Sequence, residues 1–133
     1  MSVFVDTSAF VALANSDDAR HPSAAKAWAE LLARPDPIIT SNYVVCEAVA
    51  LLQNRHGTAA VRRFTEEMLP AARIEWVDAA VHDVGLAAVL AVPGKSGPSL
   101  TDCTSFELIR RHRIESVFAY DRHFTDRQFN LTG

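Results

Sequence analysis

Two features are scarce in this sequence: cysteine and long apolar runs. Cys46 and Cys103 are the only cysteines, too few and too unpatterned for a disulfide framework or a zinc site, so we expect both to be small core residues. The five histidines show no metal-ligand spacing either. The longest apolar stretches, 43–52 and 84–92, are too short to span a bilayer, and the N-terminus lacks a secretory signal pattern. We therefore expect no membrane association and a cytoplasmic location.

Positive charge is also in short supply. The chain has 13 Lys and Arg residues against 16 Asp and Glu residues, and its formal net charge of −3 argues weakly against a nucleic acid partner. Disorder is excluded, because 49% of the residues are hydrophobic and only 22% are charged. A chain of 133 residues suffices for one domain with its own core, and no linker or repeat is visible, so we assign 1–133 to a single domain.

Short apolar segments alternate with longer helical patterns along the chain. Strands are predicted over 3–5, 37–40, 73–78 and 115–120, and helices over 7–17, 21–34, 41–57, 58–71, 78–92 and 100–113. Residues 121–133 carry no clear pattern beyond a short edge strand at their end. The alternation predicts an α/β fold with a mostly parallel sheet covered on both faces, in which ligands bind beyond the carboxyl ends of the strands.

Two of these helices carry boundary signals. Pro22 falls in the first turn of the helix over 21–34, and Gly57 is expected to end the helix over 41–57. In the first of these helices the predicted buried face consists of Ala25, Trp28, Ala29 and Leu32.

Four acids stand out because solvation does not explain them. Asp6 follows the first predicted strand and Asp121 the last clear one, so both lie at the carboxyl edge of the sheet. Glu47 has apolar neighbours at helical spacing, where an unpaired carboxylate is costly. Asp102 lies in the first turn of its helix. Because the helices carrying Glu47 and Asp102 begin near the same edge, we expect the four carboxylates to converge.

Structural roles remain open for three of these acids. Asp6 is equally well placed to cap the first helix, and Asp102 with Ser99 forms a variant of the capping box. Asp121 is compatible with a simple turn. Each interpretation is ordinary alone, whereas convergence of all four acids at one sheet edge is not.

Glu47 has a structural alternative of its own, a buried ion pair with Arg110 or Arg122. If it instead joins the other acids, like charges repel unless protons or cations neutralise them. With no cysteine or histidine set available, hard oxygen ligands indicate Mg²⁺ or Mn²⁺. A metal bound there would lower the pKa of a water and stabilise charge on a phosphodiester.

Four motifs occur in order along essentially the whole chain: VDTSAF, the Glu of NYVVCEAVALL, LTDCTSFELIRRHRI and FAYDRHF. In this order and at this length, the sequence resembles the PIN domain, and in particular the ribonuclease toxins of VapC type. The resemblance implies a three-layer α/β/α sandwich around a mostly parallel sheet of about five strands. It also implies an endoribonuclease dependent on Mg²⁺ or Mn²⁺, a cognate antitoxin that blocks the site, and commonly a homodimer.

The acidic residues of the family fall on Asp6, Glu47, Asp102 and Asp121, as metal ligands and catalytic residues. Thr7 or Ser8 falls where the family often has a hydroxyl beside the first acid. Tyr120 is a departure, because many members have a small hydroxyl residue near the last acid. Asp126 is an additional acid that nothing in its surroundings distinguishes from a surface residue.

The charge objection to RNA also weakens once the site acids are set aside. Removing four of the 16 acids leaves 12, against 13 basic residues. Several arginines flank the last two motifs and are candidates for backbone contacts with RNA, although each is individually explained as part of a solvated face. They are Arg110, Arg111, Arg113, Arg122 and Arg127.

Other enzyme classes fit less well. A phosphoaspartate receiver would need a lysine after the last strand, and the only lysines are Lys26 and Lys95. An aspartyl phosphatase would need a second acid at position 8, which is serine, and the PGKSG loop lacks the first glycine of a phosphate loop. The remaining alternative is a non-catalytic PIN-like module that binds RNA or protein.

Overall fold

A parallel β-sheet organises the chain, for which a computed structural model describes residues 1–126 and 131–132. The sheet has five strands in the order β3-β2-β1-β4-β5, and every neighbouring pair is parallel. The strands are β1 (Val3–Val5), β2 (Ile38–Ser41), β3 (Arg73–Glu75), β4 (Ser116–Phe118) and β5 (Leu131–Thr132). β1 therefore lies at the centre, so its carboxyl end opens into the middle of the sheet edge.

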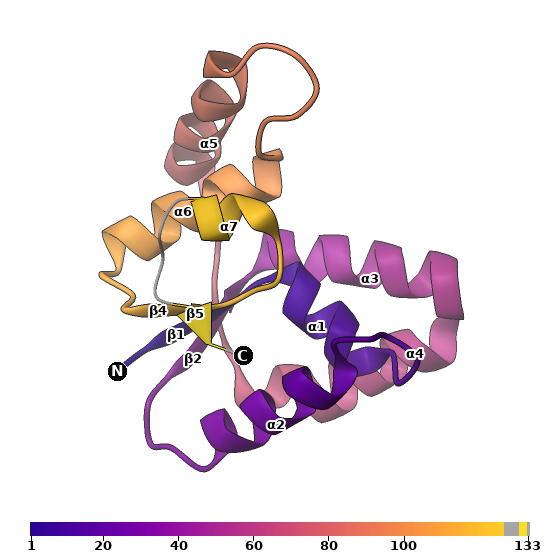
Figure 1. Cartoon of the computed structure of the whole chain (residues 1–133). Helices are drawn as coiled ribbons and strands as arrows, with labels where there is room; N and C mark the ends of the chain where they lie inside the picture. The colour runs from indigo at the N-terminus through magenta and orange to yellow at the C-terminus, as the bar shows by residue number, and fades with distance from the viewer. Residues whose placement is uncertain (127–130, 133) are drawn as a thin grey trace.

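Helices connect the strands and cover the sheet on both faces. In Figure 1, α2 lies below the strands, whereas α6 and α7 lie above them. The helices are α1 (Thr7–Ala14), α2 (His21–Leu32), α3 (Asn42–His56), α4 (Thr58–Arg63), α5 (Ala79–Ala91), α6 (Leu100–Arg111) and α7 (Arg122–Asp126). The predicted α/β sandwich with a parallel sheet is confirmed. No helix among the described residues is both long enough and apolar enough to cross a membrane.

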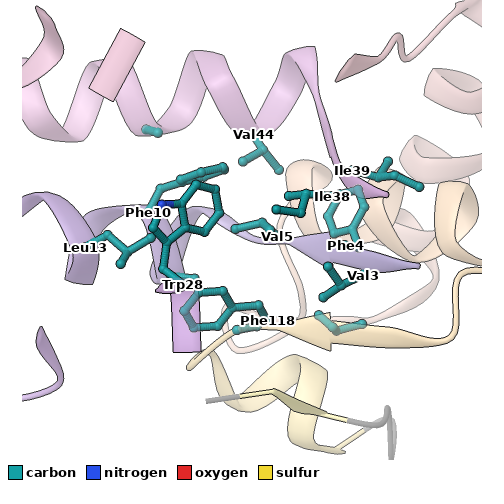
Figure 2. Close-up of a cluster of buried hydrophobic side chains, with 14 of the residues drawn as sticks. Val3, Phe4, Val5, Phe10, Leu13, Trp28, Ile38, Ile39, Val44 and Phe118 are labelled. Atoms are coloured by element: carbon teal, nitrogen blue, oxygen red, sulfur yellow. The ribbon is translucent and has the colours of Figure 1, made fainter. Parts of the chain in front are cut away.

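The core is built on the central strand and on aromatic contacts with the first helices. All three β1 side chains are buried, as expected of a strand with helices on both faces. Phe10 of α1 meets Trp28 and Phe64 edge to face, with ring centroids 6.1 and 5.0 Å apart. Figure 2 shows the β1 side chains in one cluster with Phe10 and Trp28. This packing fixes the start of α1 relative to the sheet, and with it the residue at the end of β1.

Side-chain caps and a glycine set several helix boundaries. Ser41 and Asp78 accept hydrogen bonds from the first turns of α3 and α5. Gly57 ends α3 with a φ of 82°, a conformation that favours glycine. The helix predicted over 58–71 is an α-helix only to Arg63; it continues as a π turn over Phe64–Met68 and a 3₁₀ turn over Leu69–Ala71. Pro70 lies in the 3₁₀ turn and lacks the N–H that an α-helix would need at this position, so the helix cannot continue regularly past it.

Several sequence predictions need correction. The buried face of α2 is Ala24, Ala27, Trp28 and Leu31, whereas the predicted Ala25, Ala29 and Leu32 are exposed. Both sets contain Trp28, and alanines at neighbouring positions cannot distinguish two faces offset by one residue. Cys103 is buried as expected, but Cys46 is exposed, and neither cysteine forms a disulfide within the described residues.

The C-terminal prediction was incomplete. The edge strand is present as β5, but α7 was not predicted, since a five-residue helix is too short for periodicity to reveal. Arg127 lies outside the described residues.

Candidate functional site

The carboxyl ends of β1 and β4 lie side by side. Val5 pairs with Phe118, and the Asp6 N–H donates to the Phe118 carbonyl over 3.0 Å. The residue after β1 is therefore adjacent to the segment that follows β4 and leads to Asp121. Two of the four predicted acids are brought to this edge by parallel strand pairing, as the sequence indicated.

Asp6 is both a helix cap and a buried acid. Its side chain is 2% exposed, and Oδ2 accepts hydrogen bonds from the Ser8 N–H at 3.1 Å and the Ser8 hydroxyl at 2.7 Å. These contacts make Asp6 the N-cap of α1. The other carboxylate oxygen, Oδ1, is buried and has no hydrogen-bond partner in the described part of the chain. One oxygen is thus used for capping and the other remains available for a ligand.

The hydroxyl of Ser8 joins two segments of the site. It donates to Asp6 Oδ2 and accepts from the Tyr120 N–H at 2.9 Å. Of the two hydroxyls expected beside Asp6, Ser8 therefore holds the carboxylate, whereas the Thr7 hydroxyl is buried without a partner among the described residues.

Asp102 completes a capping box at the start of α6. The Asp102 N–H donates to Ser99 Oγ at 3.1 Å, and the Ser99 N–H donates to Asp102 Oδ2 at 3.0 Å. The structural alternative for this residue is therefore present. It does not exclude a ligand, because the cap engages one oxygen of a carboxylate that has two.

Asp102, Asp121 and His123 form a cluster able to hold a metal ion. One potential ligand atom from each lies within 4.8 Å of the others. Asp102 comes from α6, while Asp121 and His123 flank the start of α7, where Asp121 Oδ1 accepts from the His123 N–H at 2.8 Å. His123 was not anticipated from the sequence. Its only local signal is its position two residues after Asp121, because the spacing among the five histidines does not indicate a metal site.

Glu47 reaches the same region from α3. It is half-buried, beside rather than within the buried stripe of that helix, which consists of Val44, Ala48 and Leu52. A pocket of about 200 Å³ is lined by Asp6, Glu47 and Asp121 together with Arg20 and Arg55. A larger cavity of about 400 Å³ lies at the opposite edge, where β2 and β3 begin, and contains none of the four acids.

The ion pair considered for Glu47 does not form. Arg110 is bound instead by Glu107, through Nε and one terminal nitrogen at 2.7 and 2.8 Å. Arg122 donates to the Ser96 carbonyl at 3.3 Å. Within residues 1–126 and 131–132, Glu47 has no ion-pair partner, which leaves its carboxylate free to bind a cation.

The electrostatics of the site favour a bound cation. Burial is the main reason that the pKa of Asp6 is raised to about 7, while hydrogen bonds from Ser8 oppose the rise and Asp102 adds to it. Burial also raises the pKa of Asp102, and the charge of Asp121 adds to that rise. The negative charges of these carboxylates therefore repel one another. The buried, unpartnered Oδ1 of Asp6 and the oxygen-rich donor set fit a divalent metal.

Known proteins share this fold and length. The PIN domain family model matches residues 3–130. The chain is 34% identical over 124 residues to the 23S rRNA-specific endonuclease VapC20 of Mycobacterium tuberculosis, in strains CDC 1551 and H37Rv, covering 92% of each chain. A crystal structure of M. tuberculosis VapC20, described as a sarcin-ricin loop cleaving toxin, matches with a TM-score of 0.82 at 33% identity, covering 96% of this chain and 95% of that one.

A more distant structure shares the architecture alone. VapBC2 from Rickettsia felis, crystallised with a DNA fragment from its promoter, matches with a TM-score of 0.70 at 14% identity, covering 98% of this chain and 97% of that one. The four ordered motifs, the parallel sheet and the matches across nearly the full length agree. The chain belongs to the PIN domain family and is a homologue of the VapC-type toxins.

Proposed function

We propose that this protein is a metal-dependent endoribonuclease that acts as the toxin of a toxin–antitoxin pair. The observation that carries the proposal is the buried Oδ1 of Asp6, which has no described partner and belongs to a pocket shared with Glu47 and Asp121. A buried carboxylate oxygen without a hydrogen bond is costly in a folded protein, and a divalent cation compensates that cost.

Each of the four acids has a role in this proposal. Asp6, Glu47, Asp102 and Asp121 would hold Mg²⁺, for which Mn²⁺ could substitute, and His123 is a further candidate ligand. A metal held there would supply activation of a water for attack on a phosphodiester and stabilisation of the charge that develops on it. Ser8 keeps the Asp6 carboxylate oriented, and the capping box does the same for Asp102. The chain supplies no nucleophile of its own in this scheme.

The substrate and partner are proposed from the relatives. VapC20 is named for cleavage of 23S rRNA, and its structure is described as a sarcin-ricin loop cleaving toxin, so an RNA stem-loop of that kind is the first substrate to test. A cognate antitoxin is expected to block the acidic pocket, and the toxin is expected to form a homodimer. A ribosomal substrate would place the protein in the cytoplasm. We further propose that residues 1–133 form one nuclease domain.

The test is cleavage of a sarcin-ricin stem-loop RNA by purified protein with Mg²⁺, with Mn²⁺ and with EDTA. We expect cleavage with either metal and none with EDTA. Asp6→Asn is purified identically, so any cleavage by this variant reveals contaminating nucleases. Asp83→Asn, on the exposed face of α5, is the matched control and should keep the activity of the wild type. RNA binding without cleavage under all conditions would favour the non-catalytic binding module instead.

A further inference from the structure

Beyond the metal ligands, we propose that Arg20 binds an RNA phosphate next to the scissile bond and that the ring of Tyr120 holds its guanidinium in place. This inference rests on the proposed nuclease function and adds a substrate-binding residue to it. Arg20 lies in the loop between α1 and α2, and it lines the same pocket as Asp6, Glu47 and Asp121. A guanidinium that lines this pocket beside the proposed metal ligands is placed to bind a phosphate of a polyanionic substrate.

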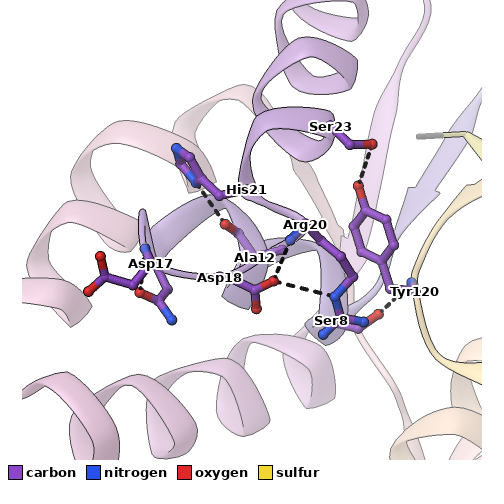
Figure 3. A network of polar contacts seen from close by, with 9 residues as sticks. Ser8, Ala12, Asp17, Asp18, Arg20, His21, Ser23 and Tyr120 are labelled. Atoms are coloured by element: carbon purple, nitrogen blue, oxygen red, sulfur yellow. Dashed lines mark hydrogen bonds and ion pairs between the residues drawn. The ribbon is translucent and has the colours of Figure 1, made fainter.

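Arg20 is held from two sides. Asp18 Oδ1 accepts from the Arg20 backbone N–H at 2.8 Å and from its Nε at 3.4 Å. The guanidinium carbon lies 5.1 Å from the centre of the Tyr120 ring, within the range of a cation–π contact. The hydroxyl at the far end of that ring lies 3.3 Å from Ser23 Oγ on α2. Figure 3 shows Arg20 between Asp18 and Tyr120.

The position of Arg20 is tied to the proposed metal ligands. The backbone N–H of Tyr120 donates to Ser8 Oγ at 2.9 Å, and Ser8 Oγ donates to Asp6 Oδ2 at 2.7 Å. Tyr120, whose ring supports the Arg20 guanidinium, directly precedes Asp121 in the chain. Its backbone is hydrogen-bonded to Ser8, the residue that orients Asp6. A phosphate bound by Arg20 would consequently have a fixed position relative to Asp6.

The loop that carries Arg20 is ordered before any ligand arrives. Asn15 Oδ1 accepts from the Asp17 N–H at 3.1 Å, and the His21 ring donates to the Ala12 carbonyl at 2.9 Å. The Arg20 backbone N–H is the main cause that lowers the pKa of Asp18, which keeps that anchor charged at neutral pH. Binding a phosphate would therefore not require the loop to become ordered first, and preorganisation of this kind favours affinity.

A purely structural role explains Arg20 less well than it explains other arginines. Arg110 gives two nitrogens to Glu107 at 2.7 and 2.8 Å, a closed bidentate pair. Arg20 offers only Nε to Asp18, at 3.4 Å, and its side chain is 50% exposed. Among the described contacts, its two terminal nitrogens have no acceptor. Those nitrogens form the fork that matches phosphate geometry.

The experiment measures binding of a fluorescein-labelled sarcin-ricin stem-loop RNA by anisotropy in Ca²⁺, with intact RNA verified on a gel, over a series of KCl concentrations. Arg20→Ala should raise Kd by about tenfold and reduce the slope of log K against log salt by about 0.7 to 0.9, the loss of one phosphate contact. Arg20→Lys keeps the charge and should keep the slope. Arg34→Ala, at the opposite edge of the sheet, is the matched control and should change neither.

Tyr120 provides the second arm. Tyr120→Phe keeps the ring and should bind as wild type does, whereas Tyr120→Leu should raise Kd by about threefold, the size of an exposed cation–π contact. A double variant that combines Tyr120→Leu with Arg20→Ala should bind the RNA no more weakly than Arg20→Ala alone, because the Tyr120 ring acts through the Arg20 guanidinium. If Arg20→Ala lowers the melting temperature, Arg20→Gln replaces it.

The outcomes separate the two proposals. If the wild type binds and cleaves the RNA and Arg20→Ala keeps the same affinity and salt slope, only the role of Arg20 is overturned. Equal losses in Tyr120→Phe and Tyr120→Leu overturn the role of the ring. Wild-type protein that neither binds nor cleaves the RNA overturns the proposed function, and the inference with it.

Discussion

The hydroxyl of Ser8 donates a 2.7 Å hydrogen bond to Oδ2 of Asp6, whose carboxyl has a pKa raised to about 7 by burial. This bond favours the charged carboxylate, so Ser8→Ala should raise the pKa further. At subsaturating Mg²⁺, where the proton on Asp6 competes with the metal, we expect the pH profile of RNA cleavage to move upward by about one pH unit, the equivalent of one hydrogen bond to a charged group. Single-turnover cleavage from pH 6 to 9 measures the shift. Ser16→Ala, exposed after α1, should leave the profile unchanged, and an unmoved Ser8→Ala profile would contradict the role of the hydroxyl.

Asp6→Asn should abolish cleavage but stabilise the metal-free protein at alkaline pH. The pKa of Asp6 is raised from 3.8 to about 7 in the folded protein, so the folded state binds this proton more tightly than the unfolded state. Stability of the wild type in EDTA therefore falls as the pH rises from about 4 to about 7 and stays low above that. The variant, which has no proton to lose there, should gain at most about 4 kcal/mol over wild type at pH 8 and nothing at pH 4.

Urea unfolding of both proteins in EDTA at pH 4, 6 and 8 tests this expectation. Asparagine still accepts the capping hydrogen bonds of α1, so the fold is retained. A variant less stable than wild type at every pH would show that Asp6 serves mainly as a cap.

Metal binding should raise the melting temperature of the wild type. A ligand specific to the folded state contributes about 2.7 kcal/mol at 100 times its Kd. Thermal unfolding with and without saturating Mn²⁺ measures the effect, and Asp6→Asn should show a smaller rise. A melting temperature that Mn²⁺ and Mg²⁺ leave unchanged would refute the metal site.

Glu47 and Glu107 form a natural pair of test residues. Glu47 has no ion-pair partner within the described residues, whereas Glu107 binds Arg110 and Arg111 at 2.7 and 2.9 Å. Glu47→Gln should leave the metal-free protein at least as stable as wild type and reduce its gain from Mn²⁺. Glu107→Gln should cost about 1 to 2 kcal/mol and keep the full gain from Mn²⁺. The reverse pattern in thermal unfolding would mean that Glu47 is structural.

His123→Ala should change metal preference rather than abolish binding. Imidazole is a better ligand for Mn²⁺ than for Mg²⁺, which prefers oxygen. We expect the variant to lose affinity for Mn²⁺ by about tenfold, the loss of one ligand, while its affinity for Mg²⁺ changes little. Isothermal titration with each metal measures the two values. Equal losses for both metals would argue that His123 acts on the position of Asp121 instead.

The sequence reveals the sheet edge more readily than the details of the helices. Asp6 and Asp121 could be placed because β-branched and aromatic runs directly before them predict strands, and parallel strands end at one edge. The faces of α2 could not be distinguished, because alanine occupies positions on both. Glu47 was expected on an apolar helix face, but its side chain is half-buried at the border of the buried stripe, a difference that tertiary packing decides.

Pairings between distant side chains were the least predictable part of the site. The capping box of Asp102 is local in sequence and was anticipated. By contrast, Arg110 was considered for Glu47 but pairs with Glu107 one turn earlier on its own helix, a contact that helical spacing alone allows. The role of Ser8 in holding Tyr120 depends on β1 and β4 being neighbours, which the order of strands in the chain does not reveal.

The pairing of β1 with β4 has a consequence for the synthesis of the protein. Asp6 is synthesised 115 residues before Asp121. Chains fold from the N-terminus during translation, but the edge that joins these acids needs β4, which begins at Ser116. A chain interrupted before that point carries the first acids without the last. The four acids can therefore meet only after β4 and the segment that follows it have been synthesised.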